Sequence, residues 1–151
     1  MDIYLLDTLL YFCLPEFEVL KSRDGIELIF FKDAVTSRNS IKKLIVKGHE
    51  NDASEEQGFW NHAHLELNVK RKDVSHLFYL SRTIGLHLMR KLKEYNPRWN
   101  YRVEAFCYAC GDADIRFSQI FTGEPVGDQM TIHAEQNDWA RYYIRMESKG
   151  E

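Results

Sequence analysis

The sequence predicts an α+β fold in which a mostly antiparallel sheet of about six or seven strands packs against one long central helix, with a short helix near the N-terminus. One extended segment, residues 73–96, carries apolar side chains at helical spacing. Several shorter segments are rich in branched and aromatic residues or alternate between apolar and polar side chains, as strands do. The links between the C-terminal segments are short, and such links join antiparallel strands.

The N-terminal half contains one short helix and two strands. Residues 2–13 have apolar side chains at helical spacing and precede Pro15, which ends the helix because the residue before a proline avoids helical geometry. Strands are expected at residues 26–32 and 41–47, where branched and aromatic residues gather. The polar, acidic segment 48–58 has a glycine at each end and is typical of a surface loop.

The elements expected in the C-terminal half are predicted from the spacing of apolar and polar residues. Residues 61–69 alternate strictly between apolar and polar side chains, which predicts a half-buried strand. The long helix at 73–96 has small residues, Ser81 and Gly85, in the middle of its apolar face, and these would let it approach a sheet closely. Strands are then expected at residues 101–108, 114–121, 129–135 and 139–146. Their short links predict an antiparallel meander. We expect residues 1–151 to form a single domain.

Length and composition favour one domain in the cytoplasm. The 151 residues fit a domain of ordinary size, and 44% hydrophobic with 28% charged residues is typical of a globular protein. The three cysteines are odd in number and sparse, which argues against a secreted disulfide framework. Acidic residues interrupt the apolar N-terminus, so we expect neither a targeting segment nor a membrane span.

Charge is sorted by segment along the chain. Residues 68–102 contain nine basic and two acidic residues, a net charge of +7, whereas residues 103–138 contain seven acidic and one basic residue, a net charge of −6. The formal charge of the whole chain, −3, hides this separation. Charge asymmetry bears on partners and on electrostatic steering, and not on the fold.

The acidic segment is the first candidate for a binding site. Most of its carboxylates lie at or beside expected turns, where we expect them to be exposed, with aromatic residues nearby. We interpret the segment as an acidic face that binds a basic protein partner, since opposed potentials speed encounter and buried aromatics hold a complex. Ordinary solvated hairpin turns are an equally open alternative. The residues expected to contact the partner are Asp112, Asp114, Glu124, Asp128, Asp138, Phe121 and Trp139.

A possible metal site forms the second candidate. His62, His64 and Glu66 are two residues apart on an expected strand, so their side chains project from one face. Imidazole and carboxylate groups are suitable zinc or iron ligands. The polar outer face of an antiparallel strand produces the same row of residues, and we favour that interpretation. We therefore expect no metal and no other cofactor.

Two further patterns have simpler explanations. Cys107 and Cys110 have CxxC spacing, but they end a strand rather than begin a helix and no second cysteine pair exists, so we expect two ordinary thiols. The basic residues of the long helix could contact phosphates, but a pI near 6.1 is far from that of a dedicated nucleic-acid binder. We expect them to form the solvent side of the helix.

No motif in the sequence names a reaction. The leading hypothesis is a non-enzymatic protein-binding domain. A small, mildly acidic, cytoplasmic α+β domain without a catalytic motif is a common profile among bacterial immunity proteins, which inhibit a toxin that is often a basic nuclease. The alternatives are a metal-dependent enzyme that uses His62, His64 and Glu66, and a nucleic-acid-binding module that uses the long helix.

Overall fold

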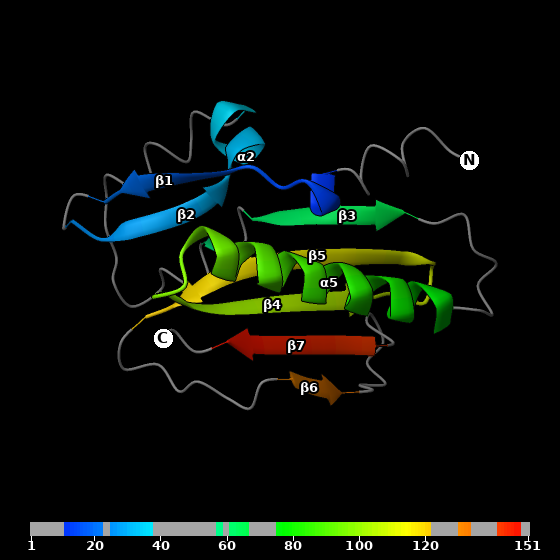
Figure 1. The fold of residues 1–151 in the computed structure, drawn as a ribbon. Coiled ribbons are helices and arrows are strands. Elements are labelled where there is room, and N and C mark those ends of the chain that lie inside the picture. The colour runs from blue at the N-terminus through cyan, green and yellow to red at the C-terminus, as the bar shows by residue number, and fades with distance from the viewer. Residues whose placement is uncertain are drawn as a thin grey trace.

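The computed structural model describes residues 11–22, 25–37, 57–58, 61–66, 75–121, 130–133 and 142–148. They form an α+β fold with antiparallel sheets and one long helix, as the sequence predicts (Figure 1). Of the predicted N-terminal helix, residues 11–13 are helical and the rest lies outside the described residues. The strand predicted at 41–47 also lies outside them. No helix in the described part of the chain is long and apolar enough to cross a membrane.

The strands belong to two sheets, so the prediction of one sheet was wrong. Strands β1 (Phe17–Lys21) and β2 (Glu27–Phe31) form a separate antiparallel hairpin. No strand was predicted at Phe17–Lys21, which a turn joins to β2. Gly25 completes that turn with a φ of 86°, a conformation that favours glycine. Helix α2 (Lys32–Ser37) then follows β2 directly, and no helix was predicted there.

The second sheet has five strands in the order β3-β5-β4-β7-β6, with every neighbouring pair antiparallel. The strands are β3 (His62–Glu66), β4 (Asn100–Cys107), β5 (Asp112–Ile120), β6 (Met130–His133) and β7 (Tyr142–Ser148). The predicted meander was wrong in its order, because β6 does not pair with β5. Strand β3 already occupies the outer edge of β5, so the β6–β7 hairpin pairs through β7 with the open edge of β4.

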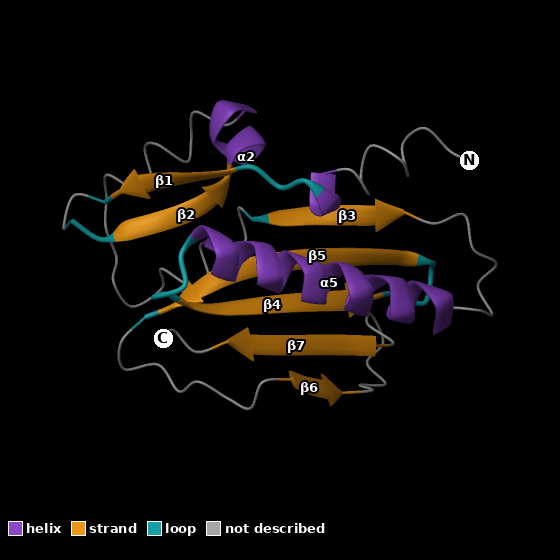
Figure 2. Cartoon of the chain, viewed as in Figure 1, coloured by secondary structure: helices purple, strands orange, loops and turns teal. Residues whose placement is uncertain are grey.

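Helix α5 (Ser75–Tyr95) confirms the predicted long helix and packs across one face of this sheet (Figure 2). Its buried face contains Leu77, Ser81, Ile84, Gly85, Leu88 and Leu92. Gly85 lies against β4 and β7: a Cβ placed on it would overlap the methyl group of Met146 and approach Val103 Cγ1 to 3.5 Å. A glycine here therefore permits the close approach that the sequence predicted.

Alternation on the strands divides the sheet into two faces. On β4, Tyr101, Val103, Ala105 and Cys107 are buried beneath α5, while the residues between them are only partly buried. Ala113, Ile115 and Phe117 of β5 and Ile144 and Met146 of β7 join the same core. The side chains of opposite parity therefore project from the face that α5 does not cover.

Buried side-chain amides join the hairpin to the five-stranded sheet. Asn61 Oδ1 accepts a hydrogen bond of 3.0 Å from the Phe31 N–H, and Gln119 Oε1 accepts one of 2.9 Å from the Ile29 N–H. The Gln57 and Asn61 amides both donate to the Ile29 carbonyl, and the Gln119 N–H donates to Gln57 Oε1. We call Gln57, Asn61 and Gln119 the amide junction. These groups satisfy the backbone of β2 where no neighbouring strand pairs with it.

Candidate functional site

The face of the five-stranded sheet opposite α5 gathers most of the described ionisable side chains of the strands. Helix α5 packs on the other face and α2 packs on β1 and β2, so neither helix covers it (Figure 2). We call it the polar sheet face. Its described members are Arg102, Glu104, Phe106 and Tyr108 of β4 and the turn after it, Asp112, Asp114 and Arg116 of β5, Tyr143, Arg145 and Glu147 of β7, and His62 and His64 of β3.

The strand register places opposite charges beside each other at the centre of this face. Glu104 lies opposite Arg116 on one side and opposite Arg145 on the other. Arg116 Nε donates to Glu104 Oε2 at 2.8 Å, and the Tyr143 hydroxyl donates to Glu104 Oε1. Both carboxylate oxygens of Glu104 therefore accept hydrogen bonds from residues of the same sheet.

A second carboxylate, Glu147, is almost fully buried at the C-terminal end of β7. Its side chain is 2% exposed and accepts hydrogen bonds from Arg102 Nε at 2.6 Å and from Arg145 Nε at 2.7 Å. A buried carboxylate without partners would be strongly destabilising. The two guanidinium groups offset the charge of Glu147 and so allow it to be buried here. The three arginines of the polar sheet face are thus bound to Glu104 and Glu147.

Aromatic rings lie among these ion pairs. The Arg116 guanidinium stacks over the Phe106 ring at 4.7 Å from its centroid, and the Phe106 and Tyr143 ring centroids are 4.8 Å apart. Burial and the hydrogen bond to Glu104 raise the pKa of Tyr143 well above the ordinary phenol range. The phenol therefore stays protonated and acts as a donor. The centre of the face is a fixed surface of rings and internally paired charges.

One corner of the face differs from this centre. Asp112 and Asp114 lie on the same side of β5, and we call them the aspartate corner. The Tyr108 hydroxyl donates to Asp114 Oδ2 at 2.6 Å, and the exposed Cys110 thiol donates to Asp112 Oδ2 at 3.3 Å. Burial and the Asp114 bond raise the pKa of Tyr108, so it too stays protonated. Within the described residues, no arginine or lysine forms an ion pair with either aspartate.

His64 of β3 completes the corner. It lies opposite Asp114 in the strand register, and its Nδ1 is within ion-pair range of Asp114 Oδ1. That oxygen is buried and accepts no aligned hydrogen bond from the described residues, so the contact is a close approach rather than a well-formed hydrogen bond. The His64 side chain is 61% exposed while that of Asp114 is 24% exposed. The imidazole therefore lies over the carboxylate on the solvent side.

The residues predicted to bind a partner fall into three groups. Asp112 and Asp114 lie together on the polar sheet face, but both are partly buried, whereas most of the acidic residues were expected to be exposed. Phe121 follows β5 at its other end and packs against a second apolar cluster with Leu28 and Phe30, roughly 23 Å along the strand from Asp114 at 3.3 Å per residue. Glu124, Asp128, Asp138 and Trp139 lie outside the described residues.

The candidate metal residues are only partly brought together. His62 and His64 share the face, and their ring centroids are 5.1 Å apart. The side chain of Glu66 is not among those described. Within the described residues, no group of three or more His, Cys, Asp or Glu side chains is placed to hold a metal ion. The contact of His64 with Asp114 was not predicted, because it depends on which strand pairs with β3.

The remaining predicted features have ordinary surroundings. Cys107 is buried next to Ser81, burial raises the pKa of its thiol, and none of the three cysteines forms a disulfide. On α5, Arg90 and Lys91 both bind Glu94, at 2.9 and 2.7 Å. The basic run at residues 70–72 lies outside the described residues.

Sequence reasoning missed the ion pairs of Glu104 and Glu147. Their signal is present as charged residues at alternate positions of the predicted strands, but the partners become visible only once the strand order is known.

Comparison of this chain with protein-family models, with curated protein sequences and with solved structures finds no significant match.

Proposed function

We propose that this chain is a non-enzymatic protein-binding domain of the bacterial cytoplasm that binds a basic protein partner at the aspartate corner. In its specific form the proposal is an immunity-type inhibitor that neutralises a basic toxin, such as a nuclease. One observation carries it: Asp112 and Asp114 lie side by side on the polar sheet face, whose arginines are already bound to Glu104 and Glu147. Among the described residues no lysine or arginine is paired with either aspartate, and the one ring nitrogen in ion-pair range is that of His64, beside Asp114.

The neighbours of the aspartate corner suit an interface. Phe106 lies opposite Asp114 in the register, and Tyr108 holds the Asp114 carboxylate in a fixed position. In protein interfaces a few residues contribute most of the binding energy, and aromatic residues are common among them. A carboxylate that is already held in place loses little conformational entropy on binding. A lysine or arginine of the partner would meet two carboxylates without displacing an arginine of the polar sheet face from Glu104 or Glu147.

The test is a binding titration with the product of the gene that lies beside the gene of this chain, because an immunity protein is encoded next to its toxin. We expect a complex that weakens as salt rises, since exposed opposite charges are screened within about 10 Å at 0.1 M salt. We also expect the complex to suppress the toxic activity. A neighbouring toxin whose activity this chain leaves unchanged would contradict the immunity form of the proposal.

A metal-dependent enzyme is the second candidate, and the contact between His64 and Asp114 favours it. Metal-binding histidines commonly present one ring nitrogen to a carboxylate, which orients the other nitrogen toward the metal. His62 lies beside His64 on the same strand and would be the second ligand. The predicted third ligand, Glu66, belongs to the same strand. Metal analysis of the purified protein separates this candidate from the first.

A further inference from the structure

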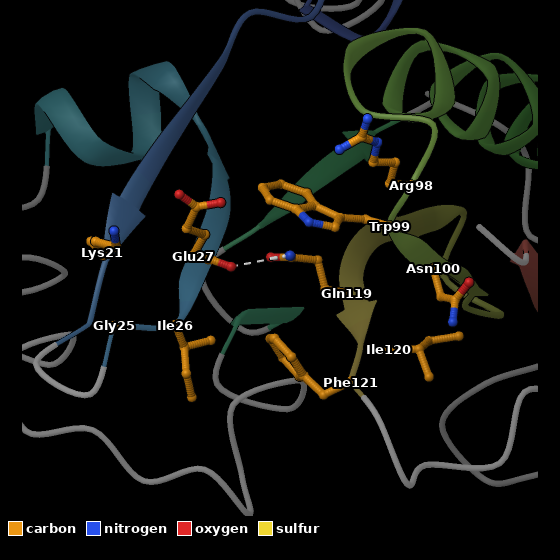
Figure 3. A pocket seen from close by; sticks show the side chains of 10 residues that line it. All are labelled: Lys21, Gly25, Ile26, Glu27, Arg98, Trp99, Asn100, Gln119, Ile120 and Phe121. Atoms are coloured by element: carbon orange, nitrogen blue, oxygen red, sulfur yellow. Dashed lines mark hydrogen bonds between the residues drawn. The ribbon is translucent and has the colours of Figure 1, made fainter. Parts of the chain in front are cut away.

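We propose that a pocket at the other end of β5 binds a small ligand that consists of a flat aromatic ring and one anionic group. The pocket has a volume of about 400 Å³ and lies between the tip of the β1–β2 hairpin and the ends of β4 and β5 (Figure 3). This volume is within the range of small-molecule sites, which often form where two structural units meet. The pocket is separate from the aspartate corner, so the inference does not depend on the proposed protein partner.

The pocket is held in shape by the amide junction. Gln119, one of its lining residues, is 3% exposed and accepts hydrogen bonds from the Ile29 N–H and from the Gln57 amide. Its own amide donates to the Glu27 carbonyl at 3.1 Å, the bond drawn in Figure 3. These bonds fix the hairpin against β5. The cavity therefore exists before a ligand enters, which lowers the entropic cost of binding.

Aromatic and aliphatic side chains supply the binding surface for a ring. In Figure 3 the Trp99 indole lies on one side of Gln119, and the Phe121 and Ile26 side chains lie on the other. Trp99 and Phe121 are both partly buried, so each keeps part of its ring accessible. Flat apolar surfaces of this kind favour stacking with a planar ligand. No hydrogen bond to a described residue uses the Trp99 indole N–H.

Charge at the rim selects an anionic group. Lys21 and Arg98 line the pocket together with a single carboxylate, Glu27, which gives the lining a net charge of +1. Lys21 and Arg98 are exposed, and neither side chain forms a hydrogen bond or ion pair with a described residue. Arg98 follows the end of α5 and precedes Trp99, and in Figure 3 its side chain lies next to the indole, so we expect it to bind the anionic group of a ligand whose ring contacts Trp99. Arginine forms strong charge-assisted hydrogen bonds with carboxylate, sulfonate and phosphate oxygens.

Two dyes with the same rings test the two parts of this ligand separately. 8-Anilinonaphthalene-1-sulfonate carries an anionic group, and N-phenyl-1-naphthylamine is its uncharged counterpart. Each is titrated into the folded protein and followed by its fluorescence. We expect both to saturate, with the sulfonate binding at least about fivefold more tightly, the effect of one partly exposed charge-assisted hydrogen bond. Equal affinity of the two dyes would overturn the anionic part of the proposal.

Variants then place the dyes in the pocket. Arg98→Gln should lower the affinity for the sulfonate dye by about fivefold and leave the affinity for the neutral dye unchanged. Phe121→Leu should lower the affinity for both dyes. The control is Arg90→Gln, which removes the same group from the exposed side of α5, where it binds Glu94. Thermal midpoints confirm that each variant is folded. Unchanged binding of the sulfonate dye in both pocket variants, or an equal loss in Arg90→Gln, would refute the site.

The natural anionic group is identified by competition. Adenosine 5′-monophosphate and indole-3-acetate each combine a planar ring with an anionic group, phosphate in one and carboxylate in the other. If one compound displaces the sulfonate dye, and binds more weakly to Arg98→Gln, the result supports the proposal. The compound that does so identifies the anionic group as phosphate or carboxylate. Failure of both compounds to displace the dye would contradict it.

Discussion

The Tyr108 hydroxyl donates a hydrogen bond of 2.6 Å to Asp114 across the turn that joins β4 to β5. The carboxylate that we propose as a binding group is therefore also part of the local structure. Its second oxygen lies beside the His64 imidazole. Substitution of Asp114 would disturb both contacts, whereas Asp112 has only the weak thiol contact of Cys110 among the described residues. Asp112 is accordingly the better position at which to test binding.

Removal of the Tyr108 hydroxyl should change how stability depends on pH. The pKa of Tyr108 is raised from the ordinary phenol value of 10.0, first by burial and then by the Asp114 carboxylate. The folded state thus favours the protonated phenol. This contribution to stability is complete below about pH 10 and is lost as the pH rises from there toward the higher pKa of the folded state.

Urea unfolding between pH 8 and pH 11 measures this loss. We expect the free energy of unfolding to fall above about pH 10, and to fall less steeply in Tyr108→Phe, which lacks the ionising group. Tyr101 and Tyr143, whose pKa values are also raised, continue to contribute in the variant. Identical pH profiles for the two proteins would show that Tyr108 ionises as it does in the unfolded chain.

The core beneath α5 is tested at two leucine positions of the helix, Leu88 and Leu86. Leu88 is fully buried, so Leu88→Ala should lower the free energy of unfolding by roughly 2–5 kcal/mol. Leu86 lies on the other side of the helix and is 44% exposed, so Leu86→Ala should change it by less than about 0.5 kcal/mol. Urea unfolding of both variants provides the comparison. Similar losses at the two positions would mean that the buried face of the helix is misassigned.

The amide junction predicts a local effect as well as a global one. Asn61→Leu keeps the size of the side chain but leaves the Phe31 N–H without its buried acceptor. An unsatisfied buried group of this kind costs roughly 1–3 kcal/mol. Amide hydrogen exchange should accelerate most at Phe31 and Ile29 and least at Val103 in the centre of the sheet. Uniform acceleration would indicate that the hairpin and the sheet unfold together.

The protein should carry no stoichiometric metal as purified. Within the described residues no group of three or more His, Cys, Asp or Glu side chains is placed to hold a metal ion, and the His64 ring lies over Asp114. Elemental analysis of protein prepared without chelator and without a histidine tag measures the content directly. About one zinc or iron per chain, lost in His64→Ala, would contradict this expectation and favour the enzyme.

Periodicity predicted those elements that a local pattern defines. The apolar face of α5, including the small residues Ser81 and Gly85, was correct because helical spacing reports burial directly. Strand β1 was missed because its five residues follow Pro15 closely and their alternation is short. The strand order could not be predicted, since it depends on which sheet edge remains open once β3 has paired with β5.

The candidate site was likewise predictable only where a local pattern in the sequence defines it. Segment charge indicated Asp112 and Asp114, and both lie on the polar sheet face. It could not show that Glu104, from the same acidic segment, is bound to Arg116 within the sheet. Nor could it show that Phe121 belongs to the opposite end of β5. Charge along a sequence does not distinguish a paired carboxylate from one that is available to a partner.

The most direct test of the protein-binding proposal is the association rate of Asp112→Lys with the basic partner at low salt. The rate should fall by about tenfold or more relative to the unaltered protein, and the difference should shrink as salt rises, because a steering charge has been reversed. The control, Glu94→Lys, makes the same change of charge on α5, across the sheet from the aspartate corner, and should alter the rate by less than about twofold. Equal rates for Asp112→Lys and the unaltered protein would contradict the proposal.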